Sequence, residues 1–392
     1  MSEWKDIVIG DIGKVITGNT PPTTNRALYG GPYPFIKPTD MEKDARYVRS
    51  WEETYSEQAF QRYKSAFIPK GATGVVTIGT VGEKLFQADR PCFTNQSVNV
   101  VVPSDDFDND FVYYLLKYNL IKVQNANPGT ASGRDHVSKS NFSSIQVTVP
   151  TDKKIQNQIG RILSTYDELI ENNIRRIAIL EQTAEQIYKE WFVRMRFPGY
   201  ENTEFEKGVP KGWEIKKVEK IVSRKSFGKT YNQDTVFDIG KTIVIDQSKK
   251  ELLGFHNNAP DHIATIEKPM IIFGDHTCKM QMIVEPFSLG ENVIPLTSVN
   301  SINVYFLYYV IHSLIETTEY KRHWKELIVK KVFVPSTLLQ NSFGELVKPL
   351  MELKNLLWKN NQNLIQTRDL LLPRLVSGKL KVKEAEKEIE TV

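Results

Sequence analysis

Two long stretches of the chain repeat apolar residues every three or four positions. The first stretch aligns Ile159, Leu163, Tyr166, Ile170, Asn173, Ile177, Leu180, Ala184, Ile187 and Trp191. The second aligns Leu346, Leu350, Leu353, Leu357, Asn360, Leu364, Thr367 and Leu371. A repeat of about 3.5 residues is typical of helices that pack along a single seam. The pattern therefore predicts two long helices, each with one asparagine in its apolar line.

The two predicted helices are best explained by packing against each other. One apolar stripe alone would fit a helix on an ordinary core, whereas two long stripes with a single Asn each favour an antiparallel pair within the chain. The predicted helix–helix seam is formed by Ile170, Asn173, Ile177, Leu180, Leu353, Leu357, Asn360 and Leu364. A buried Asn lowers the stability of such a pair but fixes its register.

The ends of these helices can also be predicted. The first is expected from about Ile155 to Trp191, which gives a length of about 55 Å at about 1.5 Å per residue. Pro349 is expected to kink the second helix near its start, and Pro373 is expected to end it, because proline lacks the amide donor that a helix interior requires. A stiff pair of this length would act as a ruler between two other parts of the chain.

Short apolar runs bounded by glycine and proline precede each predicted helix. They cover 34–37, 74–78 and 97–102 before the first helix, and 242–245 and 270–273 before the second. Runs of this kind predict strands. Helical periodicity predicts one short helix in each segment, at 110–120 and at 304–315. Each segment is therefore expected to form an α/β domain.

The second half of the chain repeats the plan of the first. Trp4 corresponds to Trp213, and the run 147–150 corresponds to 332–335, each ending in Val-Pro. Residues 160–183 align without a gap on residues 344–367. A period this long describes two copies of a domain-plus-helix unit rather than a solenoid. Such a chain has approximate two-fold symmetry, and duplex DNA is the first candidate for a nearly symmetric partner.

The predicted fold class is α+β, with two similar α/β domains joined by two long antiparallel coiled-coil helices. The predicted boundaries are 1–150 for the first domain, 151–200 for the first helix, 201–335 for the second domain, 336–380 for the second helix and 381–392 for a charged C-terminal tail. The two domains differ in the length of their loops. One scaffold carrying two different recognition surfaces is expected to show this difference.

Composition limits the function without defining it. The 392 residues exceed the size of a single core, and the net charge of +4 is compatible with nucleic acid without demanding it. Cys92 and Cys278 lie in different halves with no metal-ligand spacing, so reduced thiols are expected. No apolar stretch near the N-terminus would export the chain, and no run of eighteen apolar residues would span a membrane. A cytoplasmic protein is therefore expected.

The motifs of nucleic-acid-modifying enzymes are incomplete in this sequence. Residues 19–22 resemble the loop that holds a flipped adenine, but a Thr is inserted and the aromatic residue is missing. Residues 228–230 and 240–242 resemble the end of a phosphate loop, yet Ser223 and Thr235 stand where it needs glycine. The histidines are scattered without metal-ligand spacing. We therefore expect no catalytic residue, no metal site and no cofactor bound by this chain.

Candidate DNA contacts lie on polar loops. In loop 127–139, Arg134 could bind a guanine edge and Lys139 a phosphate, with His136 between them. A solvated surface loop explains these residue types equally well. In the second copy, residues 320–325 combine basic and aromatic side chains, among them Lys321, Arg322 and Lys325. Further candidates are Lys37 and Thr39 after one strand and Lys241 before another, although Lys37 taken singly fits a plain surface lysine better.

The chain resembles the specificity (S) subunit of type I DNA restriction-modification systems. The resemblance lies in residues 18–22 with 30–37, 91–96, 149–150, 208–213 and 370–378. These segments occur in the order of the family and cover nearly the whole chain. The duplicated layout is itself a trait of the family. The second domain departs from the pattern at 227–231, where the first domain has Gly-Asn-Thr-Pro.

The resemblance implies two target-recognition domains, each of which reads one half of a split, asymmetric DNA site. The helices would set the gap between the half-sites and dock methylation subunits, two of which are expected. Those partners would use S-adenosylmethionine to methylate adenine, and motor-nuclease subunits would join them for restriction. Two alternatives stay open: a self-contained enzyme that modifies nucleic acid, and a structural coiled-coil adaptor.

Overall fold

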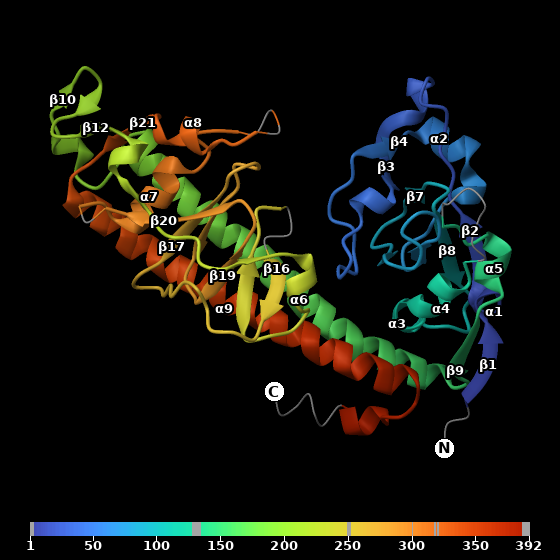
Figure 1. Cartoon of the computed structure of the whole chain (residues 1–392). Coiled ribbons are helices and arrows are strands. Elements are labelled where there is room, and N and C mark those ends of the chain that lie inside the picture. The colour runs from blue at the N-terminus through green and yellow to red at the C-terminus, as the bar shows by residue number, and fades with distance from the viewer. Residues whose placement is uncertain are drawn as a thin grey trace. The chain divides into compact units, whose positions relative to one another are not determined.

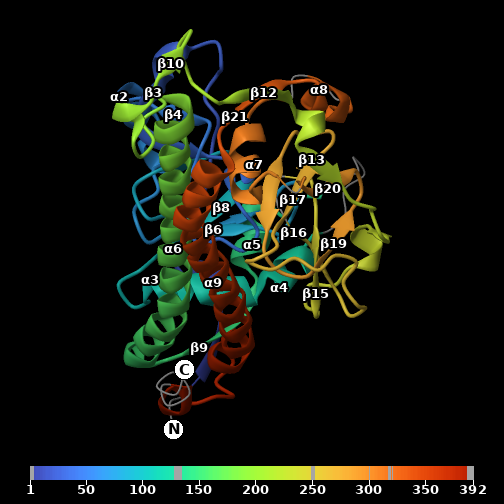
Figure 2. The same cartoon turned by 90° about the vertical axis from the view of Figure 1, so that its left-hand side faces the viewer.

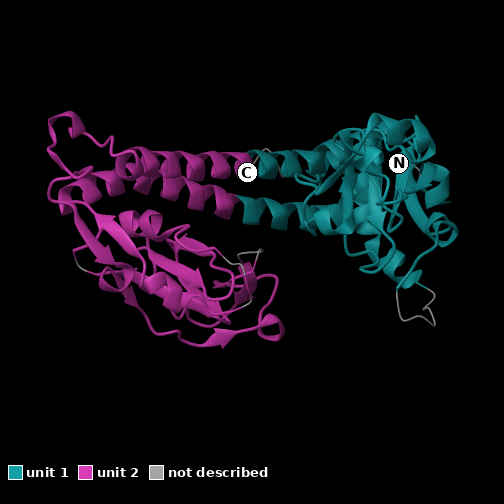
Figure 3. Cartoon of the chain, turned by 90° about the horizontal axis from the view of Figure 1, so that it is seen from above, with its two compact units in different colours: residues 1–172, 361–392 teal, residues 173–360 magenta. Residues whose placement is uncertain are grey.

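The computed structural model describes residues 4–127, 135–248, 252–299, 301–316, 319 and 321–385. The chain forms two compact units (Figure 3). Unit 1 consists of Met1–Asn172 with Asn361–Val392, and unit 2 consists of Asn173–Asn360. Each unit therefore contains one globular domain together with parts of both long helices. The predicted domain boundaries follow the chain, whereas the compact units divide each long helix between them.

The domain of unit 1 contains a helix-flanked set of sheets (Figure 1). Strand β1 (Trp4–Val8) pairs antiparallel with β9 (Gln146–Pro150). One antiparallel sheet has the order β2 (Gly13–Thr17), β8 (Val98–Pro103), β5 (Thr73–Val76) and β6 (Leu85–Gln87). A second has the order β4 (Glu53–Tyr55), β3 (Tyr29–Ile36) and β7 (Phe93–Thr94). The short helices are α1 (Ile9–Ile12), α2 (Glu57–Arg62), α3 (Asn109–Tyr118), α4 (Leu120–Asn125) and α5 (Lys139–Ser143).

The domain of unit 2 has comparable elements. Strand β12 (Glu214–Lys217) pairs antiparallel with β21 (Lys331–Val334). One sheet has the order β13 (Val222–Arg224), β20 (Val293–Ser298), β17 (Met270–Gly274) and β18 (Met280–Ile283). Another has the order β14 (Thr230–Tyr231), β19 (Phe287–Gly290), β15 (Thr242–Ile245) and β16 (Leu252–His256). The remaining elements are the hairpin β10 (Phe205–Glu206) and β11 (Val209–Pro210), and helices α7 (Val304–Ile311) and α8 (Trp324–Ile328).

The topologies of the two domains correspond strand by strand. The order β2-β8-β5-β6 recurs as β13-β20-β17-β18. In the other sheet, β3 pairs parallel with β7 and antiparallel with β4, just as β15 pairs parallel with β19 and antiparallel with β16. The predicted duplication of one α/β domain is therefore confirmed. Strand β14 has no counterpart among the described strands of unit 1, which agrees with a common scaffold that carries different loops.

Both long helices are present, and they begin 184 positions apart. Helix α6 covers Lys153–Tyr188 and continues as a π-type turn over Lys189–Val193, while α9 covers Thr337–Val376. The predicted end at Pro373 is wrong. A proline in the last turn removes few helical hydrogen bonds, and its own carbonyl still accepts the Ser377 amide at 3.3 Å. Gly378 ends this segment instead, with a left-handed φ of +74° and the Trp4 ring where a side chain would lie.

The helices pair antiparallel in each unit (Figure 2). In unit 1, Asp167 of α6 forms an ion pair with Arg368 of α9. In unit 2, the Glu181 carboxylate of α6 lies 2.5 Å from the Lys354 Nζ of α9. Glu181 comes fourteen residues after Asp167, and Lys354 comes fourteen residues before Arg368, so the two helices run in opposite directions. Fourteen residues are two heptads, which is the spacing of a coiled-coil seam. The antiparallel helix pair predicted from the sequence is confirmed.

The predicted seam residues are buried to different extents. Ile170, Asn173 and Leu357 are buried, whereas Ile177, Leu180, Leu353 and Leu364 are partly buried. The prediction for Asn360 is wrong, because Asn360 is exposed and its neighbour Asn361 is buried. The buried position after Leu357 comes four residues later instead of three, and the line continues through Arg368, Leu371 and Leu375 with the alternating steps of four and three that a seam requires.

The same buried glutamine fastens the start of each long helix to its domain. Gln156 accepts the Asp108 amide at 3.1 Å and donates to the Pro150 carbonyl at 3.1 Å. In unit 2, Gln340 accepts the Asn303 amide at 3.0 Å and donates to the Pro335 carbonyl at 2.8 Å. Both glutamines are buried, and they lie 184 positions apart. The helix origin is thus set by the same three groups in both copies.

Helices α3 and α7 form the contact between each domain and the long helices. In unit 1, the core joins α3 to α6 and α9 through Phe111, Leu115, Ile159, Leu163, Leu371 and Leu375. In unit 2, the core joins α7 to them through Phe306, Val310, Ala184, Phe192, Phe343 and Val347. A separate apolar cluster lies between the sheets of each domain. Each domain therefore has one core against the long helices and a second core of its own.

Candidate nucleic-acid interface

The basic segment 321–325 of unit 2 is fixed by the turn between β17 and β18. Asp275 in this turn accepts the backbone amides of His323 at 3.0 Å and Trp324 at 2.9 Å. The first amides of a helix lack partners within the helix, and a carboxylate satisfies both their hydrogen bonds and their positive end. Asp275 therefore orients the start of α8, and with it the side chains around it.

The three cations predicted here differ in their surroundings. Lys321 is paired with Glu326 at 2.9 Å and Glu319 at 3.4 Å, and these hydrogen bonds raise its pKa. The Arg322 side chain is 76% exposed, with Asp275 3.9 Å away, and Lys325 is exposed on α8. Arg322 and Lys325 are therefore more available to phosphates than Lys321, which would have to leave two carboxylates. Tyr320 of the same predicted patch lies outside the described residues.

A second basic and aromatic cluster follows β13. The Arg224 guanidinium lies over the Phe227 ring at 4.7 Å and the Trp324 ring at 5.8 Å. Lys229 lies 5.1 Å from the centre of the Tyr231 ring. Stacked aromatic and cationic groups are the means by which proteins hold bases and phosphates together. We name residues 224–231 the β13–β14 segment; it contains the point at which the second domain departs from the family pattern.

Lys241 belongs to the neighbourhood of this β13–β14 segment. Its amide donates to the His256 carbonyl at 3.1 Å, and the His256 ring stacks on Tyr231 with 4.2 Å between ring centres. Lys241 itself is exposed. Lys241 and Lys229 are thus both connected to the stacked rings of His256 and Tyr231. The sequence analysis missed Arg224 and Lys229, although the alternation of basic and aromatic residues from 224 to 231 was a usable signal.

In unit 1, Lys37 has two acidic partners. Its Nζ lies 2.7 Å from Glu52 and 3.3 Å from Glu53, and the hydrogen bond that it donates to Glu52 is the main cause of its raised pKa. Its backbone amide also donates to Asp40 at 2.8 Å. Thr39 is exposed in the turn that follows. Lys37 therefore supports the turn, and it would have to release Glu52 and Glu53 to bind a phosphate.

The predicted recognition loop 127–139 is only partly described. Arg134 lies outside the described residues, which omit 128–134. The His136 amide donates to the Asn127 side chain at 3.3 Å, and Asn127 donates to Asp135 at 2.6 Å, so these residues close the base of the loop. Lys139 is exposed in the first position of α5. His136 therefore belongs to the hydrogen-bonded residues at the base of the loop, and Lys139 follows three positions later.

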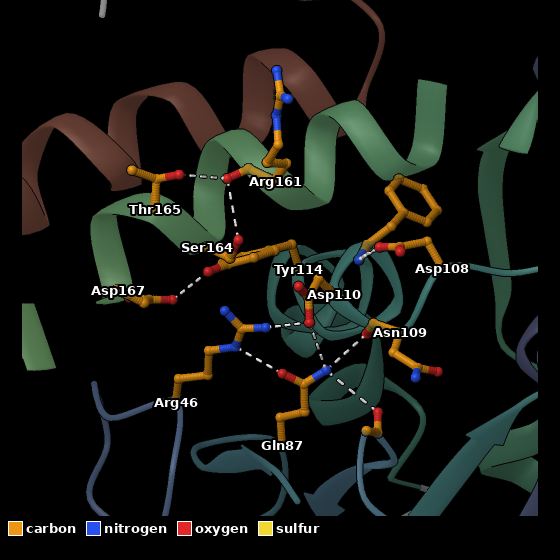
Figure 4. A network of polar contacts seen from close by, with 12 residues as sticks. Arg46, Gln87, Asp108, Asn109, Asp110, Tyr114, Arg161, Ser164, Thr165 and Asp167 are labelled. Carbon is orange, nitrogen blue, oxygen red and sulfur yellow. Dashed lines mark hydrogen bonds and ion pairs between the residues drawn. The ribbon is translucent and has the colours of Figure 1, made fainter. Parts of the chain in front are cut away.

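A buried polar network joins the unit 1 domain to its helices (Figure 4). Arg46 donates to Gln87 at 2.7 Å and is ion-paired with Asp110. The Tyr114 hydroxyl donates to Asp167, and burial together with this carboxylate raises the pKa of Tyr114. Arg46, Tyr114 and Asp167 are almost fully buried, so these side chains hold the domain against α6 and do not face solvent. No local sequence pattern pointed to it.

The described residues contain no cluster of three or more His, Cys, Asp or Glu side chains that could hold a metal ion. Cys92 is buried and Cys278 is partly buried, and both are free thiols. Burial raises the pKa of the Cys92 thiol, so it stays protonated and unreactive. Within the same part of the chain, no helix combines the length and apolar character that a membrane span requires. What the described surface offers is exposed cations beside aromatic rings, which suits binding of a polyanion.

Known proteins resemble this chain along most of its length. Residues 1–182 match the family model of the type I restriction modification DNA specificity domain. The MjaIX specificity subunit of Methanocaldococcus jannaschii is 27% identical over 97% of this chain and 94% of its own length. The HindI specificity subunit of Haemophilus influenzae is 28% identical over 45% of this chain and 39% of its own length. A crystal structure of a type I S subunit from M. genitalium has the same fold, with a TM-score of 0.57, 19% identity and coverage of 95% and 96%.

Proposed function

We propose, because the chain is a homologue of type I specificity subunits, that it is the DNA-recognition subunit of a restriction-modification complex. The observation that carries this proposal is the similarity to a specificity subunit over 97% of the chain. The duplicated domains and the paired helices support it, because a chain of this plan offers two separate readers of DNA. Sequence recognition is its contribution, and the chemistry belongs to partner subunits.

Each domain reads one half of a bipartite, asymmetric site. The two domains share strand order but differ in their loops, and loops carry the base contacts that distinguish one sequence from another. In unit 2, Arg322 and Lys325 contact phosphates, while Arg224 and Phe227 of the β13–β14 segment approach the bases. In unit 1, Lys139, which is exposed at the start of α5, contacts a phosphate. Different loops on one scaffold explain why the two half-sites differ.

The long helices set the gap between the half-sites. Both begin at an equivalent point of their domain, where Gln156 and Gln340 make the same pair of hydrogen bonds. A helix rises about 1.5 Å per residue, and one turn of B-DNA takes about 34–36 Å. The number of skipped base pairs therefore follows from helix length, without any contact to the skipped bases.

The outer faces of the helices dock methylation subunits. Large apolar side chains lie exposed there, namely Ile179, Leu338, Leu356 and Leu370. These side chains are spread along both long helices, where a partner that follows the helices would cover them. Two methylation subunits, one for each copy of the repeat, bind S-adenosylmethionine and methylate adenine, and motor-nuclease subunits add restriction. This complex acts on chromosomal and foreign DNA in the cytoplasm.

Selection from a pool of randomised DNA duplexes tests the proposal. The chain is incubated with its methylation partners, and the bound duplexes are sequenced. We expect a motif of two unlike half-sites separated by a fixed number of unselected base pairs. A continuous motif, or no motif, would contradict the proposal.

Two further assays separate the remaining alternatives. Transfer of a labelled methyl group by this chain alone would favour a self-contained enzyme. A salt dependence of DNA affinity that is unchanged when Lys139, Lys321 and Arg322 are replaced together by alanine would favour a structural adaptor, because each neutralised phosphate contributes about 0.9 to the slope.

A further inference from the structure

The helix pair of unit 1 contains a buried pair of opposite charges. Asp167 of α6 is ion-paired with Arg368 of α9, and their side chains are only 4% and 1% exposed. The Tyr114 hydroxyl donates to the same carboxylate, and Asp369 lies 2.9 Å from the Arg368 guanidinium. Charges removed from water to this degree are tolerated only when each has its counter-charge and hydrogen bonds.

The equivalent place in unit 2 is apolar. The offset of 184 residues between the copies puts Met351 in the position of Asp167 and Ala184 in the position of Arg368. Met351 and Ala184 are 6% and 1% exposed and belong to the same apolar core. The two copies of the repeat therefore use different pairs at one matched position, an ion pair in unit 1 and a methionine–alanine pair in unit 2.

This difference decides which helices can pair. Because α6 and α9 are copies of one pattern, α6 could in principle pair with α6 of a second molecule, and α9 with α9. In an α6–α6 pair, Asp167 would face Ala184 of the other copy, and this would occur twice. In an α9–α9 pair, Arg368 would face Met351, also twice. An α6–α6 pair would bury two Asp167 carboxylates without Arg368, and an α9–α9 pair would bury two Arg368 guanidinium groups that keep only Asp369 as a counter-charge.

The aromatic residues of unit 2 add a mismatch of shape. Phe343 of α9 packs on Phe192 and Trp191 of α6, with ring centres 5.2 and 6.0 Å apart. The repeat puts Ile159 in the position of Phe343, and Leu375 and Val376 in the positions of Trp191 and Phe192. In an α6–α6 pair, Trp191 and Phe192 would face Ile159 instead of Phe343. In an α9–α9 pair, Phe343 would face Leu375 and Val376 instead of Trp191 and Phe192. Such pairs leave voids or overpack.

We propose that Asp167 and Arg368 form a pairing-selectivity element, which makes α6 accept α9 of the same fold and reject a second copy of itself. The partner that fits this surface is the complementary half of the chain. Two helices built on the same seam pattern would otherwise allow two first halves, or two second halves, to associate. Selective pairing ensures that every helix pair brings together the two different recognition domains.

The full chain can test this selectivity after a single cut. A protease site in the β10–β11 hairpin at Lys207, which is exposed, allows cleavage after folding. The N-terminal and C-terminal halves then stay together through the helix pairs of both units. After the nicked complexes exchange partners, native mass spectrometry separates N·C, N·N and C·C species by mass.

The natural chain should give N·C species in at least about a hundredfold excess over the like-with-like species, because each of those buries two charges that have lost their partner on the other helix. The variant Asp167→Met with Arg368→Ala gives unit 1 the pair of unit 2. It should move the mixture toward about 1:2:1 for N·N, N·C and C·C, the ratio without discrimination. A near-statistical mixture from the natural chain would overturn the proposal, and so would a double variant that still gives N·C alone.

A charge exchange keeps the proposal falsifiable even if the apolar variant folds poorly. Nicked Asp167→Arg, Arg368→Asp protein should form N·C species with itself but not with the nicked natural chain, since mixed pairs bring like charges together. Free formation of mixed pairs would contradict the proposal. The matched control is Glu181→Gln with Lys354→Gln, a partly exposed interhelical pair in unit 2. It should leave the excess of N·C unchanged, and a comparable loss of selectivity there would also count against Asp167 and Arg368.

Discussion

The two units attach the same domain to the same helix pair by different chemistry. In unit 1, a polar network of Arg46, Asp110, Tyr114, Asp167 and Arg368 accompanies the apolar core between α3 and the long helices. In unit 2, it is aromatic, with Tyr188, Phe192, Tyr309 and Phe343 in mutual ring contact. The glutamine at the helix start makes the same hydrogen bonds in both units. The same hydrogen bonds therefore fix the start of the long helix in both units, whereas the side chains packed between domain and helices differ.

The polar contact should be more sensitive to partial loss than the aromatic one. A buried ion pair contributes little net stability over an apolar pair of the same shape, but removing one partner leaves a buried charge alone. Arg368 illustrates the balance, because burial would lower its pKa and yet Asp167 and Asp369 raise it. An aromatic cluster loses stability in proportion to the volume removed.

The largest effect is expected from breaking the ion pair. Arg368→Ala leaves Asp167 buried without its counter-charge and should lower the free energy of unfolding by about 3–5 kcal/mol. Adding Asp167→Met should recover most of this loss, because the double variant recreates the pair found in unit 2. Urea unfolding of the single and double variants measures both values. A double variant as unstable as the single one would refute the equivalence of the two positions.

The shared glutamines should show equal effects in both units. Gln156→Ala and Gln340→Ala each leave a buried backbone amide and a carbonyl without partners, which costs about 1–3 kcal/mol. The same unfolding assay applies, with Gln158→Ala on the same helix as a control that changes no such hydrogen bond. If only one of the two variants lost stability, the glutamine would not fasten the helix in the same way in both units.

A smaller effect is expected on DNA binding by unit 2. Arg322→Ala with Lys325→Ala should reduce the slope of log affinity against log salt by about 1.8, or about 0.9 for each phosphate that is no longer neutralised. Lys321→Ala should change the slope less, since Glu319 and Glu326 already neutralise it. Titration of labelled duplex at several salt concentrations measures the slopes. Equal slopes for Lys321 and Arg322 variants would remove the distinction between paired and available cations.

The smallest effect concerns pH and should be confined to unit 2. His256 is buried, and burial, together with Lys229, lowers its pKa against the opposing effect of Asp261. A histidine with a lowered pKa stabilises the fold in its neutral form, so this contribution is complete above about pH 6.5 and is lost as the pH falls further. The corresponding sheet of unit 1 contains Tyr55, whose pKa burial raises, so it stays neutral throughout.

Unfolding at pH 7.5 and 5.5 therefore distinguishes the units. Amide hydrogen exchange should report weaker protection of β15 and β16 at the lower pH, with β3 and β4 changed less. His256→Asn should reduce the difference between the two pH values. Equal acid sensitivity of the variant and the natural chain would assign the effect to other groups.

The helices and the repeat could be predicted because their signals are local or periodic. Seam spacing and the 184-residue offset gave both long helices and their antiparallel pairing, and short apolar runs gave the strands. Pro373 and Asn360 were misplaced because proline is tolerated in a last turn and because the next seam residue can lie either three or four positions after the previous one. The errors therefore lie at helix ends and in helix phase, where sequence rules are weakest.

The recognition surface and the contacts behind it were less accessible. The acidic partners of Lys37 lie at 52 and 53, and Asp275 caps a helix that begins almost fifty residues later. Arg46, Gln87 and Asp110 come together from three separate elements. Such contacts depend on tertiary structure and leave no periodic trace. A basic residue in a sequence thus predicts charge, but only the fold shows whether that charge is already paired.

One measurement tests most directly the claim that the helices space two DNA readers. Seven residues inserted into α6 after Asn172 and seven into α9 before Asn361 lengthen both helices by one heptad, about 10.5 Å. With about 3.4 Å per base pair, duplex selection should return the same two half-sites with a gap longer by about 3 base pairs. An unchanged gap, with both half-sites still selected, would contradict the account.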